Sequence, residues 1–159
     1  MKHLIHIMKR ITFTLLLLSF FLALHAQVST PSAPRLFRAD IDYMIPQRYT
    51  SRPVMDFSLE MRGDTVEVHL PYIGEVYTPA FTTDGLNFTE PVKGLKQGQD
   101  KKGNHVITFE TKHDIVTYTF RLTLSDGGDI HVSLHPSNAQ YCSYSGTWER
   151  TEISKASKR

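Results

Sequence analysis

MDFSLEMRGDTVEVHLPYIGEVY, residues 55–77, is the stretch of this chain that most directly predicts its fold. Apolar residues alternate with polar ones in its first half, where the apolar set is Met55, Phe57, Leu59 and Met61. Such alternation puts one set of side chains on a single face of a strand. Gly63 supplies a turn, and the alternation resumes in residues 66–72. The stretch therefore predicts a β-hairpin with one buried face, which ends in a bend at Pro71 and Gly74.

The same pattern recurs along the rest of the chain. It is longest in VTYTFRLTL, residues 116–124, where large apolar residues alternate with threonine and arginine. Shorter strands are expected around residues 39–44, 86–89, 92–97, 105–111, 130–134 and 141–149. Turn residues separate them, and no segment after the N-terminal region has a helical period. We predict an all-β fold: an antiparallel meander of about eight strands, closed as a small lipocalin-like barrel or folded as a two-layer sandwich.

The N-terminus has the features of an export signal. An apolar run, residues 11–24, follows three basic residues, Lys2, Lys9 and Arg10. The run is shorter than the roughly 20 apolar residues that a membrane anchor needs, so we expect cleavage between Ala26 and Gln27 and no transmembrane segment afterwards. No cysteine directly follows this cut to carry a lipid. These features predict a periplasmic or secreted protein.

Four segments follow from these patterns. Residues 1–26 are the signal peptide, residues 27–38 a flexible Ser- and Pro-rich leader, residues 39–150 a single antiparallel β domain, and residues 151–159 a disordered tail. Loss of the signal leaves 15 of the 18 basic residues against 16 acidic ones, a net charge of −1 with neutral histidines. Basic residues are densest in residues 93–102 and 155–159. Both stretches are typical of a solvated loop or tail, so we expect no nucleic-acid partner.

The sequence lacks the patterns of common catalytic and metal sites. Cys142 is the only cysteine, and its place on an alternating strand is typical of a small buried residue. The five histidines after residue 26 each occupy a polar-facing position or a turn, where a solvated side chain is ordinary. Two of them, His131 and His135, share a strand face but are separated by roughly 13 Å, too far for one ion. Glu60 and Glu67 face each other across the hairpin on its polar side, where solvated carboxylates are ordinary. We therefore predict no catalytic residue, no metal and no cofactor, and a hydrolase is our third choice of function.

Aromatic residues provide the main indication of a binding function. Most large aromatics fill cores, but tyrosine and tryptophan also combine contact area with a polar tip that suits ligands. The candidate ligand-binding residues are Tyr72, Tyr77, Tyr118, Tyr144 and Trp148. Our first hypothesis is a non-catalytic binding module of the bacterial envelope, with the bend at residues 71–77 as one wall, for a small apolar, glycan or peptide ligand. The alternative is an assembly protein that docks onto an envelope partner by strand addition.

Several stretches of the chain resemble known sequence patterns. LPYIGEVY (residues 70–77), KKGNHVITFE (residues 101–110), VTYTFRLTLSDGGDIHVSL (residues 116–134) and SYSGTW (residues 143–148) resemble a bacterial envelope family catalogued as domain of unknown function 4251. The resemblance implies export and a β-rich domain, and it implies no catalytic activity. Separately, Asp64-Thr65-Val66 resembles a short pattern for O-glycosylation in some bacterial envelopes, which makes Thr65 a candidate modification site.

Overall fold

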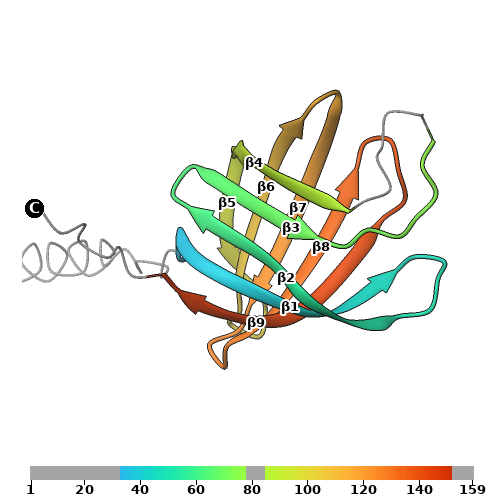
Figure 1. The fold of residues 1–159 in the computed structure, drawn as a ribbon. Coiled ribbons are helices and arrows are strands. Elements are labelled where there is room, and N and C mark those ends of the chain that lie inside the picture. The colour runs from blue at the N-terminus through green and yellow to red at the C-terminus, as the bar shows by residue number, and fades with distance from the viewer. Residues whose placement is uncertain (1–32, 78–84, 152–159) are drawn as a thin grey trace, which may run out of the picture. The chain divides into compact units, whose positions relative to one another are not determined.

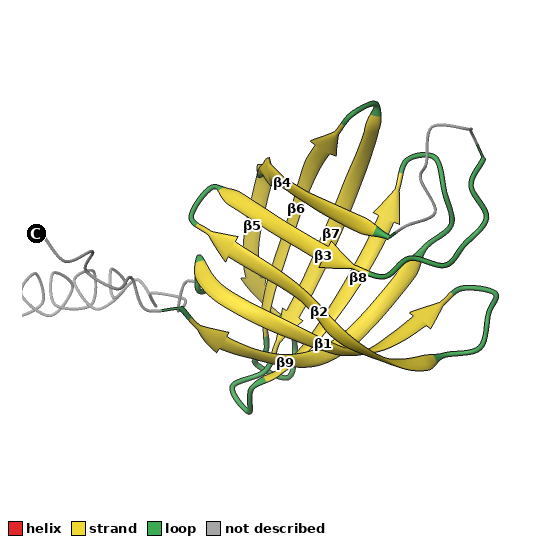
Figure 2. Cartoon of the chain, in the orientation of Figure 1, coloured by secondary structure: helices red, strands yellow, loops and turns green. Residues whose placement is uncertain are grey.

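The computed structural model describes residues 33–77 and 85–151, which form nine β-strands and no helix. The strands are β1 (Leu36–Pro46), β2 (Arg52–Arg62), β3 (Thr65–Leu70), β4 (Leu86–Pro91), β5 (Lys93–Gln99), β6 (His105–His113), β7 (Val116–Leu124), β8 (Asp129–Pro136) and β9 (Cys142–Arg150). Figure 2 shows these strands joined by loops and turns. The all-β prediction is confirmed. The predicted signal peptide, its cleavage point between Ala26 and Gln27, and the tail after residue 151 lie outside the described residues.

All nine strands belong to one antiparallel sheet, in the order β4-β3-β2-β1-β9-β8-β7-β6-β5. Neighbours in the sheet are also consecutive in the chain, except at the centre, where β1 pairs with β9. Figure 1 shows the sheet curling round until β4 lies near β6, which makes a nearly closed barrel. The predicted meander and the barrel alternative are confirmed, and a single curled sheet replaces the two-layer sandwich.

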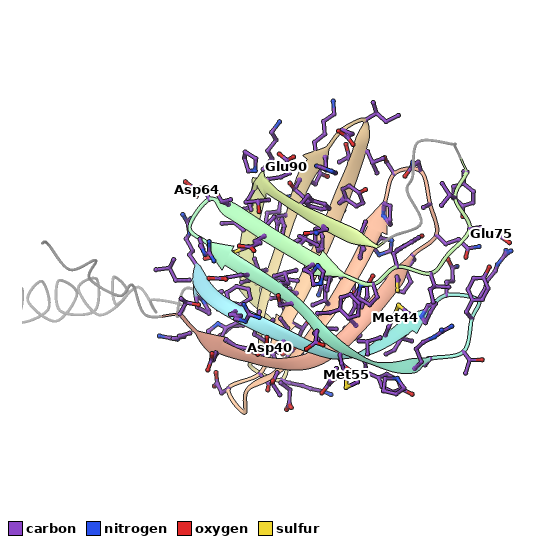
Figure 3. The ribbon with its side chains drawn as sticks, in the orientation of Figure 1. Asp40, Met44, Met55, Asp64, Glu75 and Glu90 are labelled. Carbon is purple, nitrogen blue, oxygen red and sulfur yellow. The ribbon has the colours of Figure 1, made fainter. Side chains whose placement is uncertain are left out.

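Side chains close the gap between the two ends of the sheet. The hydroxyl of Thr111 on β6 donates to the carbonyl of Pro91 on β4 at 3.1 Å. Nδ1 of His113 lies 3.0 Å from Oε1 of Glu90, and the ring of Phe88 stacks on the ring of His113 with centroids 4.8 Å apart. Figure 3 labels Glu90 at this edge of β4. The barrel is therefore closed by side-chain contacts between β4 and β6, not by a backbone ladder.

The interior of the barrel is filled by the alternating apolar set of each strand. On β6, β7 and β8 every second residue is buried, as the sequence pattern predicts. Phe109 and Phe120 lie opposite each other in register, and their rings stack with centroids 5.1 Å apart. The buried apolar residues of every strand except β5 form one hydrophobic cluster, against which the partly buried Leu95 of β5 packs. The core therefore occupies the space in which a lipocalin-like barrel would hold a ligand.

One residue of the predicted buried set lies on the outside. Met55 is 82% exposed, whereas Leu59 and Met61 on the same strand are completely buried. The cause is an irregular pairing of β1 with β2, in which residue 42 lies opposite residues 54–56. Asp56 adopts a φ of 66° within this bulge. Because a bulge resets the alternation, the assignment of Met55 to the buried face is wrong.

The ordered sheet begins earlier than the predicted boundary at residue 39. Phe37, which we placed in the flexible leader, is fully buried on β1. Backbone hydrogen bonds hold this start in place: Gly63 N donates to Arg35 O at 2.9 Å, and Thr151 N donates to Leu36 O at 3.2 Å. The described part of the chain has no helix long and apolar enough to cross a membrane.

Candidate functional site

The five aromatic residues proposed to bind a ligand do not form one exposed surface. Tyr72, Tyr118 and Tyr144 are buried in the core, with exposed fractions of 9%, 4% and 0%. Trp148 is partly buried against the core, and Tyr77 is 65% exposed. Of the proposed set, only Tyr77 is freely available to a partner.

Two of the buried tyrosines fasten the bend at residues 71–77 to the barrel. Tyr144 on β9 donates its hydroxyl to the carbonyl of Pro71 at 2.7 Å. Tyr72 donates its hydroxyl to the carbonyl of Gln140 at 2.5 Å. Burial raises the pKa of Tyr144 well above its ordinary value and also raises that of Tyr72. Both hydroxyls therefore stay protonated and serve as donors.

The bend also pairs with the connection between β8 and β9. Val76 and Ala139 form an antiparallel bridge. Tyr77 N donates to Asn138 O at 2.8 Å, and Gln140 N donates to Glu75 O at 3.0 Å. A side chain at position 74 would meet Tyr72, because an added Cβ would lie 2.5 Å from Oη and 2.9 Å from Cζ of that ring. The Pro-Tyr-Ile-Gly motif, residues 71–74, therefore has a structural role, and the absence of a side chain at Gly74 leaves space for the buried ring of Tyr72.

We expect Gly74→Ala to lower the free energy of unfolding by about 2 kcal/mol, because the new methyl group overlaps an anchored ring. Tyr72→Phe removes Oη, which is the nearest atom to this methyl group. Gly74→Ala should therefore lower the free energy of unfolding less in the Tyr72→Phe background. Urea unfolding of the unmodified protein, the two single variants and the double variant would measure the coupling between the two positions. Strictly additive effects would contradict this account of the glycine.

An ion pair joins the bend to the connection between β1 and β2, residues 47–51. Nη1 of Arg48 lies 3.4 Å from Oε2 of Glu75, and the same oxygen accepts from Nε2 of Gln140 at 2.9 Å. Tyr49 is 47% exposed and Tyr77 is 65% exposed. Figure 3 labels Glu75 on the side of the sheet where the β1–β2 connection also lies. We call this surface, formed by residues 47–51 and 75–77, the loop end; it presents two exposed tyrosines beside a charged pair.

Trp148 lies at the opposite end of β9 from the loop end. Its Nε1 donates to the carbonyl of Ser125 at 2.9 Å. Its ring meets the buried ring of Phe37 edge to face, with centroids 6.1 Å apart. The indole N–H of Trp148 thus already has a hydrogen-bond acceptor in the β7–β8 turn, and the indole ring packs against the core.

The histidines of the described residues are dispersed. His69 stacks on Phe57 with ring centroids 5.2 Å apart, and His135 lies 4.5 Å from the ring of Tyr141. His105 departs from the expectation that each histidine is solvated, because it faces inward at the start of β6 and is only 6% exposed. Its nearest carboxylate is that of Asp126, 3.7 Å from Nε2. No group of three or more metal-ligating side chains occurs within residues 33–77 and 85–151.

Glu60 and Glu67 face each other across the hairpin, as predicted. Arg62 lies between them: its Nε and Nη2 donate to Glu60 at 2.7 and 2.8 Å, and Nη2 also lies 3.3 Å from Oε2 of Glu67. The solvated position expected for Glu60 is wrong, because this residue is 8% exposed. The hydrogen bonds from Arg62 lower the pKa of Glu60. An ionised carboxylate of this kind suits an ion pair and does not suit a general acid.

Cys142 is fully buried at the start of β9. Burial raises the pKa of its thiol, and Sγ contacts the carbonyl of Ile45 at 3.9 Å. A protonated and inaccessible thiol fills the core and does not act as a nucleophile.

A surface groove, which no local sequence pattern indicates, lies over β5, β6 and β7. It has a volume of about 270 Å³, and its lining includes Lys96, Gly98, Thr108 and Arg121. Alternation places each of these residues on the polar face of its strand. Their meeting depends on strand register, which alternation does not fix.

These features define a class of protein: an all-β protein whose single meander sheet curls into a barrel filled by its own side chains. The family model described as Domain of unknown function (DUF4251) matches residues 33–148, and the chain belongs to this family. The fold is similar to the crystal structure of a DUF4251 family protein from Bacteroides eggerthii, with a TM-score of 0.54 and 16% identity over 73% of this chain and 80% of that chain. No curated protein matches the chain.

Proposed function

We propose that the protein is exported and acts, in the periplasm or outside the cell, as a non-catalytic binding module that recognises a glycan at the loop end. The signal-like pattern of residues 1–26 supports export. The observation that supports binding is the pair of exposed tyrosines, Tyr49 and Tyr77, on two loops joined by the Arg48–Glu75 ion pair.

A glycan fits this surface better than the other two ligand classes. Tyrosine rings offer rigid, amphipathic contact area at low entropic cost. The neighbouring guanidinium and carboxylate of Arg48 and Glu75 can exchange hydrogen bonds with hydroxyl groups. A small apolar ligand prefers an enclosed pocket, but here core side chains fill the barrel. A peptide that binds by backbone pairing needs a free strand edge, which the loop end does not supply.

Native mass spectrometry of the protein purified from the cells that make it tests this proposal. We expect a chain of residues 27–159 that carries a discrete carbohydrate mass. The double variant Tyr49→Ala/Tyr77→Ala should lower the ratio of bound to free protein at least about tenfold, because aromatic anchors dominate such contacts. Tyr43→Ala is the matched control, since Tyr43 is 38% exposed and lies on β1. A bare wild-type mass, or equal loss in both variants, would contradict the proposal.

A denaturing spectrum of the same sample separates a bound glycan from the O-glycosylation proposed at Thr65. Thr65 is the first residue of β3, is partly exposed, and follows Asp64, whose side chain is 88% exposed. A covalent glycan survives denaturation and should disappear in Thr65→Val. If the mass of the denatured protein equals that of residues 27–159, Thr65 is not modified and the O-glycosylation proposal is wrong.

Strand addition is the second candidate function, because within the described residues the outer edges of β4 and β5 have no backbone ladder to a further strand. The edge of β5 carries two features that oppose such pairing. It has two lysines, Lys93 and Lys96, and its register shifts between them around Gly94, which has a φ of 59°. A protein partner that stays bound in the native spectrum, in place of a carbohydrate, would favour strand addition over glycan binding.

A further inference from the structure

The groove over β5, β6 and β7 contains a row of three polar side chains. Lys96 pairs directly with Thr108, and Thr108 pairs directly with Arg121. Direct partners in an antiparallel ladder point to the same face, and the exposure of Lys96 and Arg121 shows that this face is the outer one. Two strand spacings place the backbones of the two cations roughly 10 Å apart, with the threonine hydroxyl between them.

The next row along the strands supplies open space. Gly98 pairs with Val106, and a Cβ added to Gly98 would meet no atom within 4 Å. The groove therefore has a glycine floor at this point, and its volume of about 270 Å³ suits a small ligand or one group of a larger one.

Among the described residues, the two cations of the groove have no carboxylate within ion-pair distance. Four other arginines each lie within ion-pair distance of a carboxylate: Arg35, Arg38, Arg48 and Arg62. Within residues 33–77 and 85–151, no such pair involves Lys96 or Arg121. On the side of β7 away from β6, Arg121 pairs directly with Ser133 of β8, which carries no charge. In the part of the chain that the structure describes, neither groove cation is therefore neutralised by an ion pair.

Two acidic residues lie near the groove, and one of them, Asp100, is held by hydrogen bonds within its own turn. Asp100 lines one end of the groove, but its carboxylate accepts hydrogen bonds from the backbone of Lys102 at 2.8 Å and from the backbone and side chain of Asn104 at 3.0 and 2.9 Å. Glu110 follows Thr108 on the outer face of β6, and its direct partner is Lys93. The residues that line the groove include two cations, Lys96 and Arg121, and one carboxylate, Asp100, so their net charge is +1.

We propose that this groove binds the anionic group of a small ligand, either a carboxylate or a phosphate. Arg121 would hold two oxygens of the anion through its planar guanidinium, Lys96 would neutralise it from the other side, and the hydroxyl of Thr108 would donate a hydrogen bond between them. The groove lies on β5–β7 and shares no residue with the loop end, so this proposal does not depend on glycan binding there.

Amide shifts in an NMR titration of the chain without its signal peptide test the site. The probes are inorganic phosphate and glucuronate, with glucose as the neutral blank. We expect saturable shifts confined to β5, β6 and β7, and at least about tenfold weaker binding in Lys96→Gln/Arg121→Gln, because each charge-assisted hydrogen bond contributes more than a neutral one. The matched control is Lys112→Gln/Arg150→Gln, which removes the same charge from exposed positions outside the groove.

Each outcome decides the proposal. Saturation by phosphate alone supports the site and indicates a phosphorylated ligand, whereas saturation by glucuronate alone supports it and indicates a sugar acid. Absence of saturable shifts with both anions, or equal weakening in the control pair, overturns it. The double variant Tyr49→Ala/Tyr77→Ala should titrate like the unmodified protein, which separates this site from the loop end.

Discussion

Gly146→Ala is expected to lower the free energy of unfolding by about 3 kcal/mol, the upper part of the usual range for overpacking. Gly146 lies opposite Ile41 where β9 pairs with β1. A Cβ at this position would overlap the carbonyl oxygen of Asp40 and would lie 2.9 Å from its carbonyl carbon and 3.0 Å from Cα of Ile41. All three are backbone atoms, so a change of rotamer cannot relieve the overlap.

Urea unfolding followed by the fluorescence of Trp148, the only tryptophan, would measure this loss. Gly98→Ala is the matched control, because an added Cβ there meets nothing within 4 Å. Its stability should stay within about 0.5 kcal/mol of the unmodified protein. Equal stability of Gly146→Ala and Gly98→Ala would contradict the close approach of β1 to Gly146.

Tyr144→Ala is expected to lower the free energy of unfolding by about 4 kcal/mol, the usual cost of removing a large buried ring. Tyr144 is fully buried, and its hydroxyl donates to Pro71 O. Tyr144→Phe keeps the ring and loses that hydrogen bond, so it should cost about 1 kcal/mol. The difference in stability between the two variants gives the contribution of the buried ring. The loss of stability in Tyr144→Phe gives the contribution of the hydrogen bond that holds the bend.

Tyr77→Ala is the control for this pair, because Tyr77 is 65% exposed. Its effect on stability should be about 0.5 kcal/mol or less. If Tyr144→Ala were no more harmful than Tyr77→Ala, the assignment of Tyr144 to the core would be wrong. Together the three variants separate the tyrosine that builds the fold from the tyrosine proposed to bind a ligand.

Most of the fold could be predicted from the sequence because its signals are local. The alternation in residues 116–124 gives β7 with its bounds and its buried face. The prediction for Met55 failed because the bulge beside it arises from the pairing of β2 with β1, and no local sequence pattern near position 55 indicates this bulge. The prediction for His105 failed for a different reason: this residue was assigned to solvent because it is polar, although alternation places it on the same face of β6 as the buried Ile107 and Phe109.

Less of the candidate site could be predicted. Tyr118 and Tyr144 lie in the alternating apolar sets of their strands, and the structure places both in the core. The loop end depends on Arg48 and Glu75, which are 27 residues apart and belong to no motif. The groove likewise depends on the register of three strands. Both surfaces are made by long-range contacts, which local sequence patterns do not contain.

The pairing of β1 with β9 has a consequence for how the chain reaches its native state. This ladder joins the first strand to the last, and it is the strand ladder that connects β1–β4 to β5–β9 in the sheet. Closing so long a loop is entropically costly, so the sheet should be completed late and slowly. During synthesis, β1 can pair with β2 early, but its other edge has to wait for the final strand to emerge. A polypeptide whose barrel cannot close until its last strand is made can still be threaded through a narrow protein-conducting pore.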